Sequence, residues 1–300
     1  MSSFLLKNVF KFSNLANQSR AIAPVANAGG VLSTRDFSVS SKLESDYVSV
    51  NVEHGVRKIV LNRPQAKNAL RFDMVEKIGL ALLEASTDSA TKLVTLTGVG
   101  DYFTSGNDLN NWDITNQTLE EMKERGRTSI INHFLKGLLE CTKPIIALVN
   151  GPAIGVGATM LPFCDQVLAS DKAFFATPFT AIGIVPEVCS SYLFPKIMGY
   201  SKANDVLLFG HRLTAEEAQT CGFITKVFPS DVFADSCQKL IHEYSQLPLE
   251  PLMKAKELIR APEREKLRQL ATYELNVVNT CIDTPYFKAN LANFFANKVK

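Results

Sequence analysis

Two apolar segments are each followed by a glycine-bearing turn, and this arrangement limits the folds open to the chain. Residues 92–97 form a short apolar run, and the turn Ser105–Leu109, which contains Gly106, comes shortly after it. Residues 144–149 are nearly all apolar, as in a strand buried on both faces, and the glycine-rich turn Asn150–Gly157 follows directly. Strands that alternate with such turns and with helices favour an α/β fold with a mostly parallel sheet.

The rest of the first 230 residues extends this pattern. Apolar and polar residues alternate over 47–52 and 57–61, with His54-Gly55 between them, which predicts a β-hairpin. The apolar spacing then predicts helices over 72–85, 119–139 and 155–163, and a strand over 166–169.

After about residue 230 the pattern is helical only. It predicts helices over 234–246, 250–260 and 263–281, with Pro248 and Pro262 in the gaps. We therefore expect an α/β core over residues 43–230 and a C-terminal helical module over residues 231–300.

The composition is that of an ordinary globular protein and excludes several classes. The chain has 300 residues, 46% hydrophobic and 21% charged, with a net charge of +2. It has no basic tract for nucleic acid and no apolar run of the ~18 residues expected of a membrane span. The six cysteines are scattered and none forms a C-x-x-C pair, so we expect reduced thiols and no metal site.

Residues 1–42 differ from the rest. Their only acidic residue is Asp36, whereas the basic residues are Lys7, Lys11, Arg20, Arg35 and Lys42. This composition predicts a mitochondrial transit peptide, and the alternative is a tail without a targeting role. Because Lys298-Val299-Lys300 is not a Ser-Lys-Leu signal, the sequence favours the mitochondrial matrix over the peroxisome.

The two glycine turns can present backbone N–H groups to a ligand. Gly106 allows the chain to bend so that the N–H of Asn107 points into a pocket, and the second turn places free N–H groups at the start of a helix. Two such turns aimed at one oxygen form an oxyanion hole. Ordinary turn chemistry and tight strand–helix packing are the alternatives. The spacing matches neither phosphate-binding pattern, G-x-G-x-x-G or G-x-x-x-x-G-K-[ST].

Glu187 follows both turns and is the candidate acid/base. A carboxylate beside an oxyanion hole can move a proton next to a carbonyl, which indicates enolate chemistry with one acid/base group and neither metal nor redox cofactor. The alternative is a charge at a helix N-terminus.

Several motifs in a fixed order resemble the crotonase family, the enoyl-CoA hydratase/isomerase superfamily. They are the two glycine turns, the stretch to Glu187, an Arg-Pro-x-x-x-Asn-Ala motif over residues 63–69 and a later stretch over residues 210–222. The resemblance runs from about Tyr47 to the C-terminus. It implies a spiral of ββα units, C-terminal helices that build a homotrimer or a hexamer, and an acyl-CoA thioester as substrate without a cofactor.

The resemblance also implies roles for single residues. The oxyanion hole would be formed by the N–H groups of Asn107 and Val156. Trp112 and Met160 are candidates for apolar lining, and Asp108 is interpreted as a turn residue rather than a second acid. The substrate-binding residues would be Lys67, Ala69, Ser105, Gly106, Asn107, Asp108, Leu109 and Gly155.

Two positions disfavour a hydratase. Family hydratases use two glutamates, and the matching positions here hold Thr159 and Phe179, which cannot exchange a proton as a carboxylate does. The chain instead resembles the branch that isomerises cis or trans 3-enoyl-CoA to trans-2-enoyl-CoA in fatty-acid β-oxidation. In that branch the glutamate of a Pro-Glu-Gly stretch is the base and Cys-Ser-Ser-Tyr follows. Val188 stands where that branch has glycine, which leaves open an inert acyl-CoA-binding relative.

Overall fold

The structure is a computed structural model that describes residues 47–112 and 118–298, with side chains to residue 293. The predicted transit peptide over residues 1–42 lies outside the described residues.

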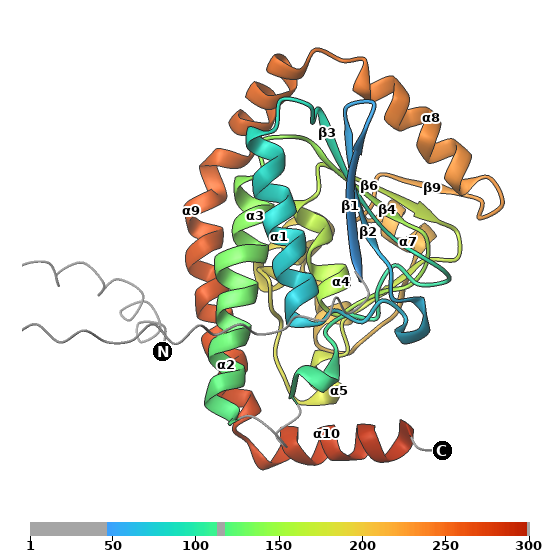
Figure 1. Cartoon of the computed structure of the whole chain (residues 1–300). Coiled ribbons are helices and arrows are strands. Elements are labelled where there is room, and N and C mark those ends of the chain that lie inside the picture. Colours follow the sequence, from blue (N-terminus) through green and yellow to red (C-terminus); the bar gives the residue numbers. More distant parts are fainter. Residues whose placement is uncertain (1–46, 113–117, 299–300) are drawn as a thin grey trace, which may run out of the picture. The chain divides into compact units, whose positions relative to one another are not determined.

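A six-stranded sheet forms the centre, in the order β1-β2-β3-β4-β6-β9 (Figure 1). The predicted hairpin is confirmed, because β1 and β2 pair antiparallel across a turn in which His54 and Gly55 have positive φ. Every other neighbouring pair is parallel, as predicted. The strands are β1 (Val48–Glu53), β2 (Val56–Leu61), β3 (Leu93–Gly98), β4 (Ile145–Val149), β6 (Gln166–Ser170) and β9 (Lys226–Phe228).

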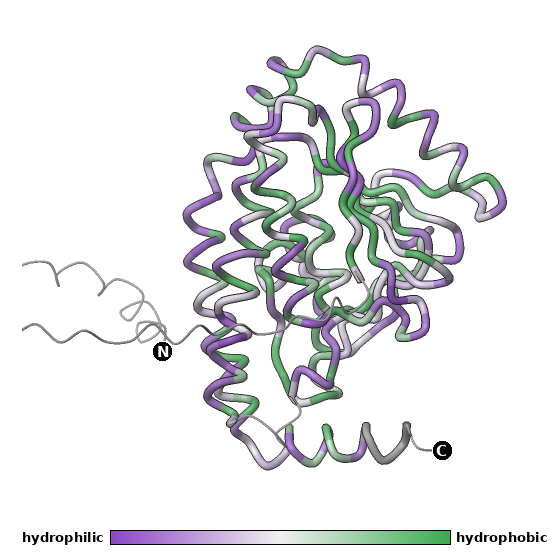
Figure 2. Tube along the Cα trace, viewed as in Figure 1, coloured by the Kyte–Doolittle hydropathy of each residue, from purple (hydrophilic) through white to green (hydrophobic). Residues whose placement is uncertain are grey.

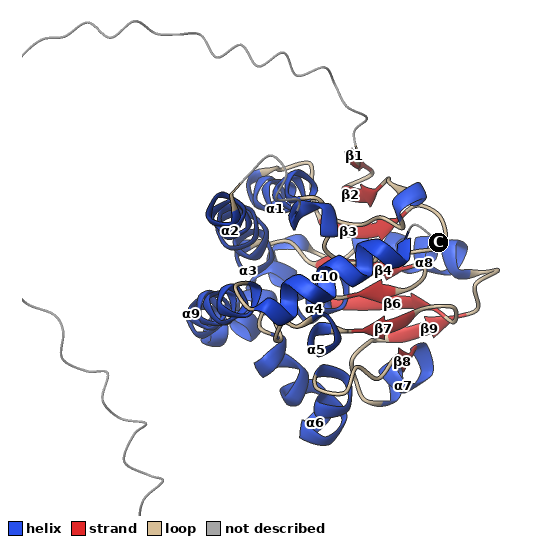
Figure 3. Cartoon of the chain, turned by 90° about the horizontal axis from the view of Figure 1, so that it is seen from below, coloured by secondary structure: helices blue, strands red, loops and turns tan. Residues whose placement is uncertain are grey.

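A second, three-stranded sheet joins the glycine-rich turn to later parts of the chain (Figure 3). Its strands are β5 (Ala153–Ile154), β7 (Phe174–Ala176) and β8 (Leu213–Thr214). β5 runs parallel to β7, and β7 runs antiparallel to β8.

Helices cover both faces of the central sheet (Figure 1). On one face lie α1 (Phe72–Thr87), α2 (Leu119–Arg127) and α3 (Lys136–Glu140), and the predicted helix over 119–139 is one helical stretch with a π-helical segment at Thr128–Leu135. Ile78 and Leu82 of α1 are buried in the main core. On the other face, Phe233 and Cys237 of α8 (Phe233–Ser245) pack on the sheet. Hydrophobic residues recur along the central strands (Figure 2).

The helices α4 to α7 lie between β5 and β9 in the sequence. The helix predicted over 155–163 is a single turn, α4 (Val156–Thr159), followed by a 3-10 turn at Leu161–Phe163. The others are α5 (Phe179–Ile182), α6 (Ser190–Leu207), which bends at Gly199, and α7 (Ala215–Thr220).

The last two helices correct the sequence prediction. The break predicted at Pro262 is wrong, because α9 runs without interruption over Leu249–Ile282. Proline removes the N–H that would bond to the carbonyl four residues earlier. That residue, Leu258, is 78% exposed, so water can satisfy its carbonyl. α10 (Pro285–Lys298) was not predicted. In the described part of the chain, no helix is long and apolar enough to cross a membrane.

Candidate active site

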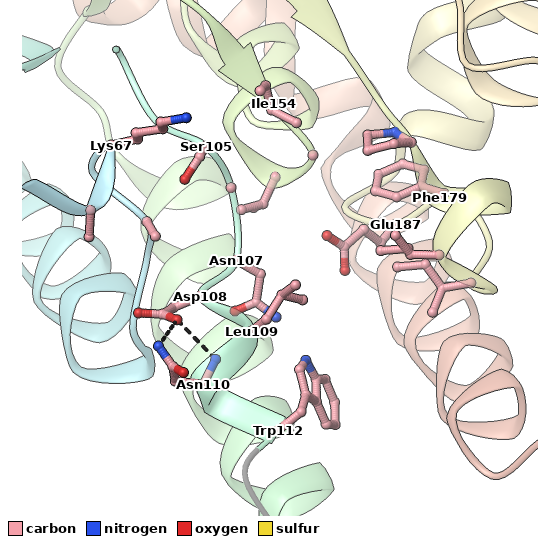
Figure 4. A pocket seen from close by; sticks show the side chains of 18 of the residues that line it. Lys67, Ser105, Asn107, Asp108, Leu109, Asn110, Trp112, Ile154, Phe179 and Glu187 are labelled. Atoms are coloured by element: carbon pink, nitrogen blue, oxygen red, sulfur yellow. Dashed lines mark hydrogen bonds between the residues drawn. The ribbon is translucent and has the colours of Figure 1, made fainter. Parts of the chain in front are cut away.

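A pocket of about 590 Å³ opens between the two glycine turns and the segment that carries Glu187. In Figure 4, Glu187 and Phe179 lie on one side, opposite the loop that carries Asn107 and Leu109. The ten positions that the sequence assigns to the acid/base, the oxyanion hole and substrate binding all line this pocket: Lys67, Ala69, Ser105, Gly106, Asn107, Asp108, Leu109, Gly155, Val156 and Glu187.

The side chain of Asn68 holds the loop at the pocket rim. Its Oδ1 accepts a hydrogen bond from the N–H of Arg63 (2.9 Å), and its Nδ2 donates to the carbonyls of Val99 (2.9 Å) and Tyr102 (2.8 Å). Asn68 is fully buried. The asparagine of the Arg-Pro-x-x-x-Asn-Ala motif thus connects the rim loop to the loop after β3. The exposed Lys67 lies beside it, with its Nζ 5.1 Å from the centre of the Tyr102 ring.

The first glycine turn presents the N–H of Asn107. Gly106 has φ +89°, and a Cβ there would lie 2.6 Å from the carbonyl oxygen of Ile154, so this position requires glycine. The residues on either side of Asn107 form backbone hydrogen bonds with Leu70. The carbonyl of Gly106 accepts from the N–H of Leu70 (2.8 Å), and the N–H of Asp108 donates to the carbonyl of Leu70 (2.9 Å). Because consecutive backbone groups in an extended segment point to opposite sides, the N–H of Asn107 faces away from Leu70.

The second turn presents the N–H of Val156. Gly155 has φ +57° and donates to the carbonyl of Ala176 (2.8 Å), which fixes the turn against β7. Since α4 has only four residues, a helix dipole adds little here, and the free N–H group itself is the donor. Within the described residues, the backbone N–H groups of Asn107 and Val156 have no hydrogen-bond acceptor.

Glu187 is a buried carboxyl group without a hydrogen-bond partner in the described part of the chain. The residue keeps partial exposure through the pocket, but its carboxyl group is surrounded by protein. Burial, and next the negative charge of Glu274, raise the pKa of Glu187 to about 7. Such a carboxyl can both accept and return a proton near neutral pH.

The backbone after Glu187 is unusual. Val188 and Cys189 have φ values of +54° and +59°, in the left-handed region that favours glycine. Val188 therefore keeps the conformation that a glycine would adopt, and its buried side chain packs in the main core. The sequence did not settle the backbone conformation of Val188, and in the structure it is the left-handed one.

Asp108 is held as a turn residue. Burial opposes its ionisation, but hydrogen bonds from Asn110 (2.9 Å from the N–H) and from Arg63 (2.5 Å) outweigh burial and lower its pKa. A carboxylate that is already paired in this way is a poor base.

The two positions that hold glutamates in hydratases supply no carboxylate. Phe179 lines the pocket beside Glu187. Thr159 is fully buried, and its hydroxyl has no hydrogen-bond partner among the described residues. Trp112 lines the pocket, as expected, whereas Met160 is a core residue.

Sequence reasoning missed the far wall of the pocket. Val278 and Ile282 of α9 and Phe287 of α10 line it, and the Trp112 and Phe287 rings meet edge to face with their centres 6.1 Å apart. The spacing of Val278 and Ile282 marks one apolar helix face, but nothing in the sequence says what that face covers.

Among the described residues, no cluster of three or more His, Cys, Asp or Glu side chains could hold a metal ion.

Residues 51–300 match the enoyl-CoA hydratase/isomerase family, and the chain belongs to this family. A crystal structure of an enoyl-CoA hydratase/isomerase from Pseudoalteromonas atlantica T6c is 37% identical with a TM-score of 0.76, and the match covers 84% of this chain and 97% of that one. The predicted crotonase-like α/β fold is thereby confirmed.

Two relatives carry more particular names. Enoyl-CoA delta isomerase 2 of Rattus norvegicus is 45% identical over 224 residues, which are 75% of this chain and 57% of the rat protein. Enoyl-CoA delta isomerase 3, peroxisomal, of Mus musculus is 40% identical over 257 residues, which are 86% of this chain and 80% of the mouse protein. The chain thus spans little more than half of the rat relative and most of the mouse one.

Proposed function

We propose that the protein is an enoyl-CoA delta isomerase that moves the double bond of a 3-enoyl-CoA to the conjugated 2-position, in fatty-acid β-oxidation. The observation that carries this proposal is the position of Glu187. It is the one carboxyl group of the described pocket lining without a partner, and it faces the turns that carry the N–H groups of Asn107 and Val156. The isomerases among the relatives support the same reaction.

The reaction needs one group that first takes and then gives a proton. The Glu187 carboxylate removes a proton from C2, and the electrons of that C–H bond form a dienolate whose negative charge rests on the thioester oxygen. The N–H groups of Asn107 and Val156 stabilise this oxygen, and one such donor is worth ~3 kcal/mol in a transition state. Protonated Glu187 then returns the proton at C4, which leaves the double bond between C2 and C3. No oxidation or reduction occurs.

The pocket walls suit the two parts of an acyl-CoA. Lys67 lies at the exposed rim, where a cation attracts the phosphates of the CoA moiety, while Trp112, Ile282 and Phe287 form an apolar wall for the acyl chain.

A direct assay tests the proposal. Purified protein mixed with a medium-chain 3-enoyl-CoA should produce the ultraviolet absorbance of the conjugated 2-enoyl thioester. Glu187→Gln should lower kcat by about a thousandfold or more, because an amide cannot accept the proton. Because Trp112 is the sole tryptophan of the chain and lines the pocket, its fluorescence should report acyl-CoA binding by this variant as well as by the wild type.

The pKa of Glu187 also fixes the pH dependence. The base must be deprotonated, so kcat/KM should fall about tenfold per pH unit below about pH 7 and level off above it. Rapid hydration of 2-enoyl-CoA without conjugation of 3-enoyl-CoA would contradict the proposal. Binding without turnover would support the inert relative instead.

We further propose that residues 1–42 direct the protein to the mitochondrial matrix, where unsaturated acyl-CoAs need this step. The mouse relative is named peroxisomal, so the compartment is a point of difference to test. A fluorescent reporter fused to residues 1–45 should enter mitochondria; a reporter in the cytosol or in peroxisomes would refute the targeting role.

A further inference from the structure

The turn that carries Glu187 is held from outside the loop by one side chain of α9. Glu274 lies 87 residues after Glu187 in the sequence and is only 4% exposed. Its Oε2 accepts a hydrogen bond from the N–H of Cys189 (2.6 Å), and its Oε1 accepts from the N–H of Ser191 (3.2 Å) and from the Ser191 hydroxyl.

These contacts fall where the loop turns into α6. Cys189 is the residue that caps α6, so its N–H and that of Ser191 belong to the free donors of a helix N-terminus. The Ser190 hydroxyl donates to the carbonyl of Glu187 itself (2.8 Å). Glu274 thus fixes the two left-handed residues, and through them the direction in which the Glu187 side chain leaves the backbone.

Glu274 is out of place as a packing residue. It lies on the buried face of α9 together with Leu267, Ala271, Leu275, Val278 and Ile282. In the described part of the chain, no cation forms an ion pair with it. The charged groups of the pocket lining do not offset it either, because Arg63 pairs with Asp108 and Lys67 lies at the exposed rim. Burying a carboxylate costs solvation free energy, so its presence here indicates a role that an apolar residue would not fill.

We propose that Glu274 is a positioning residue for the base, holding the Glu187 turn through the start of α6 and placing a negative charge behind the Glu187 carboxyl group. The role rests on the proposed isomerase function.

The charge has a definite effect on the base. Burial raises the pKa of Glu274, and the hydrogen bonds from Ser191 and Cys189 act against burial. Glu187 accepts no such bonds among the described residues, so Glu274 ionises first and Glu187 titrates against its charge. A base with a pKa near neutrality takes a C2 proton more readily than one near the ordinary glutamate value.

The test separates charge from geometry. Glu274→Gln keeps the shape of the side chain and one acceptor oxygen but removes the charge. It should move the acid limb of the kcat/KM profile to lower pH by about one unit and lower kcat about tenfold, with KM within about threefold. Glu274→Asp keeps the charge but shortens the side chain, so kcat should fall while the acid limb moves less.

Glu263 provides a matched control on the same helix. Its carboxylate also joins α9 to α6, through the Tyr192 hydroxyl (2.6 Å) and the Lys196 ammonium (2.5 Å), but it does not touch the Glu187 turn. Glu263→Gln should lower the unfolding temperature without moving kcat or the acid limb. If both glutamine variants change only stability, Glu274 is merely structural and the proposal is wrong.

A readout without turnover keeps this proposal separate from the proposed function. The carboxyl stretch of Glu187, identified by its loss in Glu187→Gln, should titrate near pH 7 by infrared difference spectroscopy and at lower pH in Glu274→Gln. If wild type does not isomerise 3-enoyl-CoA, the proposed function fails, and the infrared titration still decides the role of Glu274. If Glu274→Gln does not fold, Glu274→Asp decides: wild-type kcat in that variant overturns the proposal.

Discussion

At the scale of single residues, Val188 shows how a strained backbone serves the site. A β-branched residue at φ +54° is disfavoured by its own Cβ, which costs roughly 1–2 kcal/mol. Burial of the side chain in the main core, beside a small cavity that Ile130, Leu135 and Leu275 also line, offsets part of this cost. This left-handed turn directly follows Glu187, which lines the pocket.

Two substitutions at this position isolate the strain. Val188→Gly and Val188→Ala both remove the packing, but only glycine is free of the left-handed penalty. We expect Val188→Gly to be more stable than Val188→Ala by about 1 kcal/mol, the reverse of their usual order. Urea unfolding measures the difference, and both variants should still turn over. An alanine variant as stable as the glycine variant would mean that the loop has another conformation.

The residues of the site were predictable to different degrees. Gly106 and Gly155 were identifiable because a turn that presents N–H groups needs positive φ, and Glu187 because it follows both turns. Glu274 could not be identified from the sequence, because its partners Ser191 and Cys189 lie 83 and 85 residues away and only the fold brings them together. Its one signal is a charged residue within an apolar helix face.

At the scale of elements, the apolar end of the pocket depends on the contact between the loop after β3 and α10. Trp112 sits between Phe72 of α1 and Phe287 of α10, edge to face with both rings, at centre distances of 6.5 and 6.1 Å. Because Val278 and Ile282 of α9 extend this wall, three separate elements set the depth of the pocket.

Removing the Trp112 ring should therefore change the preference of the enzyme for the length of the acyl chain. Trp112→Ala should favour longer 3-enoyl-CoA substrates, by roughly fourfold in kcat/KM for each further methylene buried. The measurement is kcat/KM across a series of chain lengths. Tyr273→Ala is the control, since Tyr273 is an aromatic residue of α9 that is 67% exposed. An unchanged preference in Trp112→Ala would place the acyl chain elsewhere.

Several elements could be predicted because their residues show a regular period. The hairpin and the parallel strands follow from alternation and from continuous apolar runs. The strands β5 and β8 have two residues each, too short for any period to show. The continuity of α9 through Pro262 depends on the solvent exposure of the preceding turn, which the local sequence does not reveal.

At the scale of the whole molecule, several large apolar side chains remain exposed among the described residues. The four most exposed are Tyr200 within α6 (77%), Phe209 just after that helix (81%), and Leu258 and Ile259 of α9 (78% and 72%). Side chains of this size gathered on a surface commonly mark a contact with another protein.

The family resemblance implies a homotrimer, which can pair into a hexamer, and we expect these exposed side chains to lie at its interfaces. Light scattering at micromolar concentration should give three or six times the chain mass, and a stable monomer would contradict this. Phe209→Asp and Leu258→Asp each replace one of these exposed apolar side chains with a charged one. At least one of them should lower the mass of the assembly while leaving the circular dichroism spectrum unchanged.

The late position of α9 and α10 in the chain also has a consequence for biosynthesis. The chain is made from its N-terminus, so both glycine turns and Glu187 emerge from the ribosome long before Val278, Ile282 and Phe287. Until those last residues dock, the pocket lacks its far wall, and Glu274 is absent from the Glu187 turn. We therefore expect a nascent chain to become active only when its translation is nearly complete.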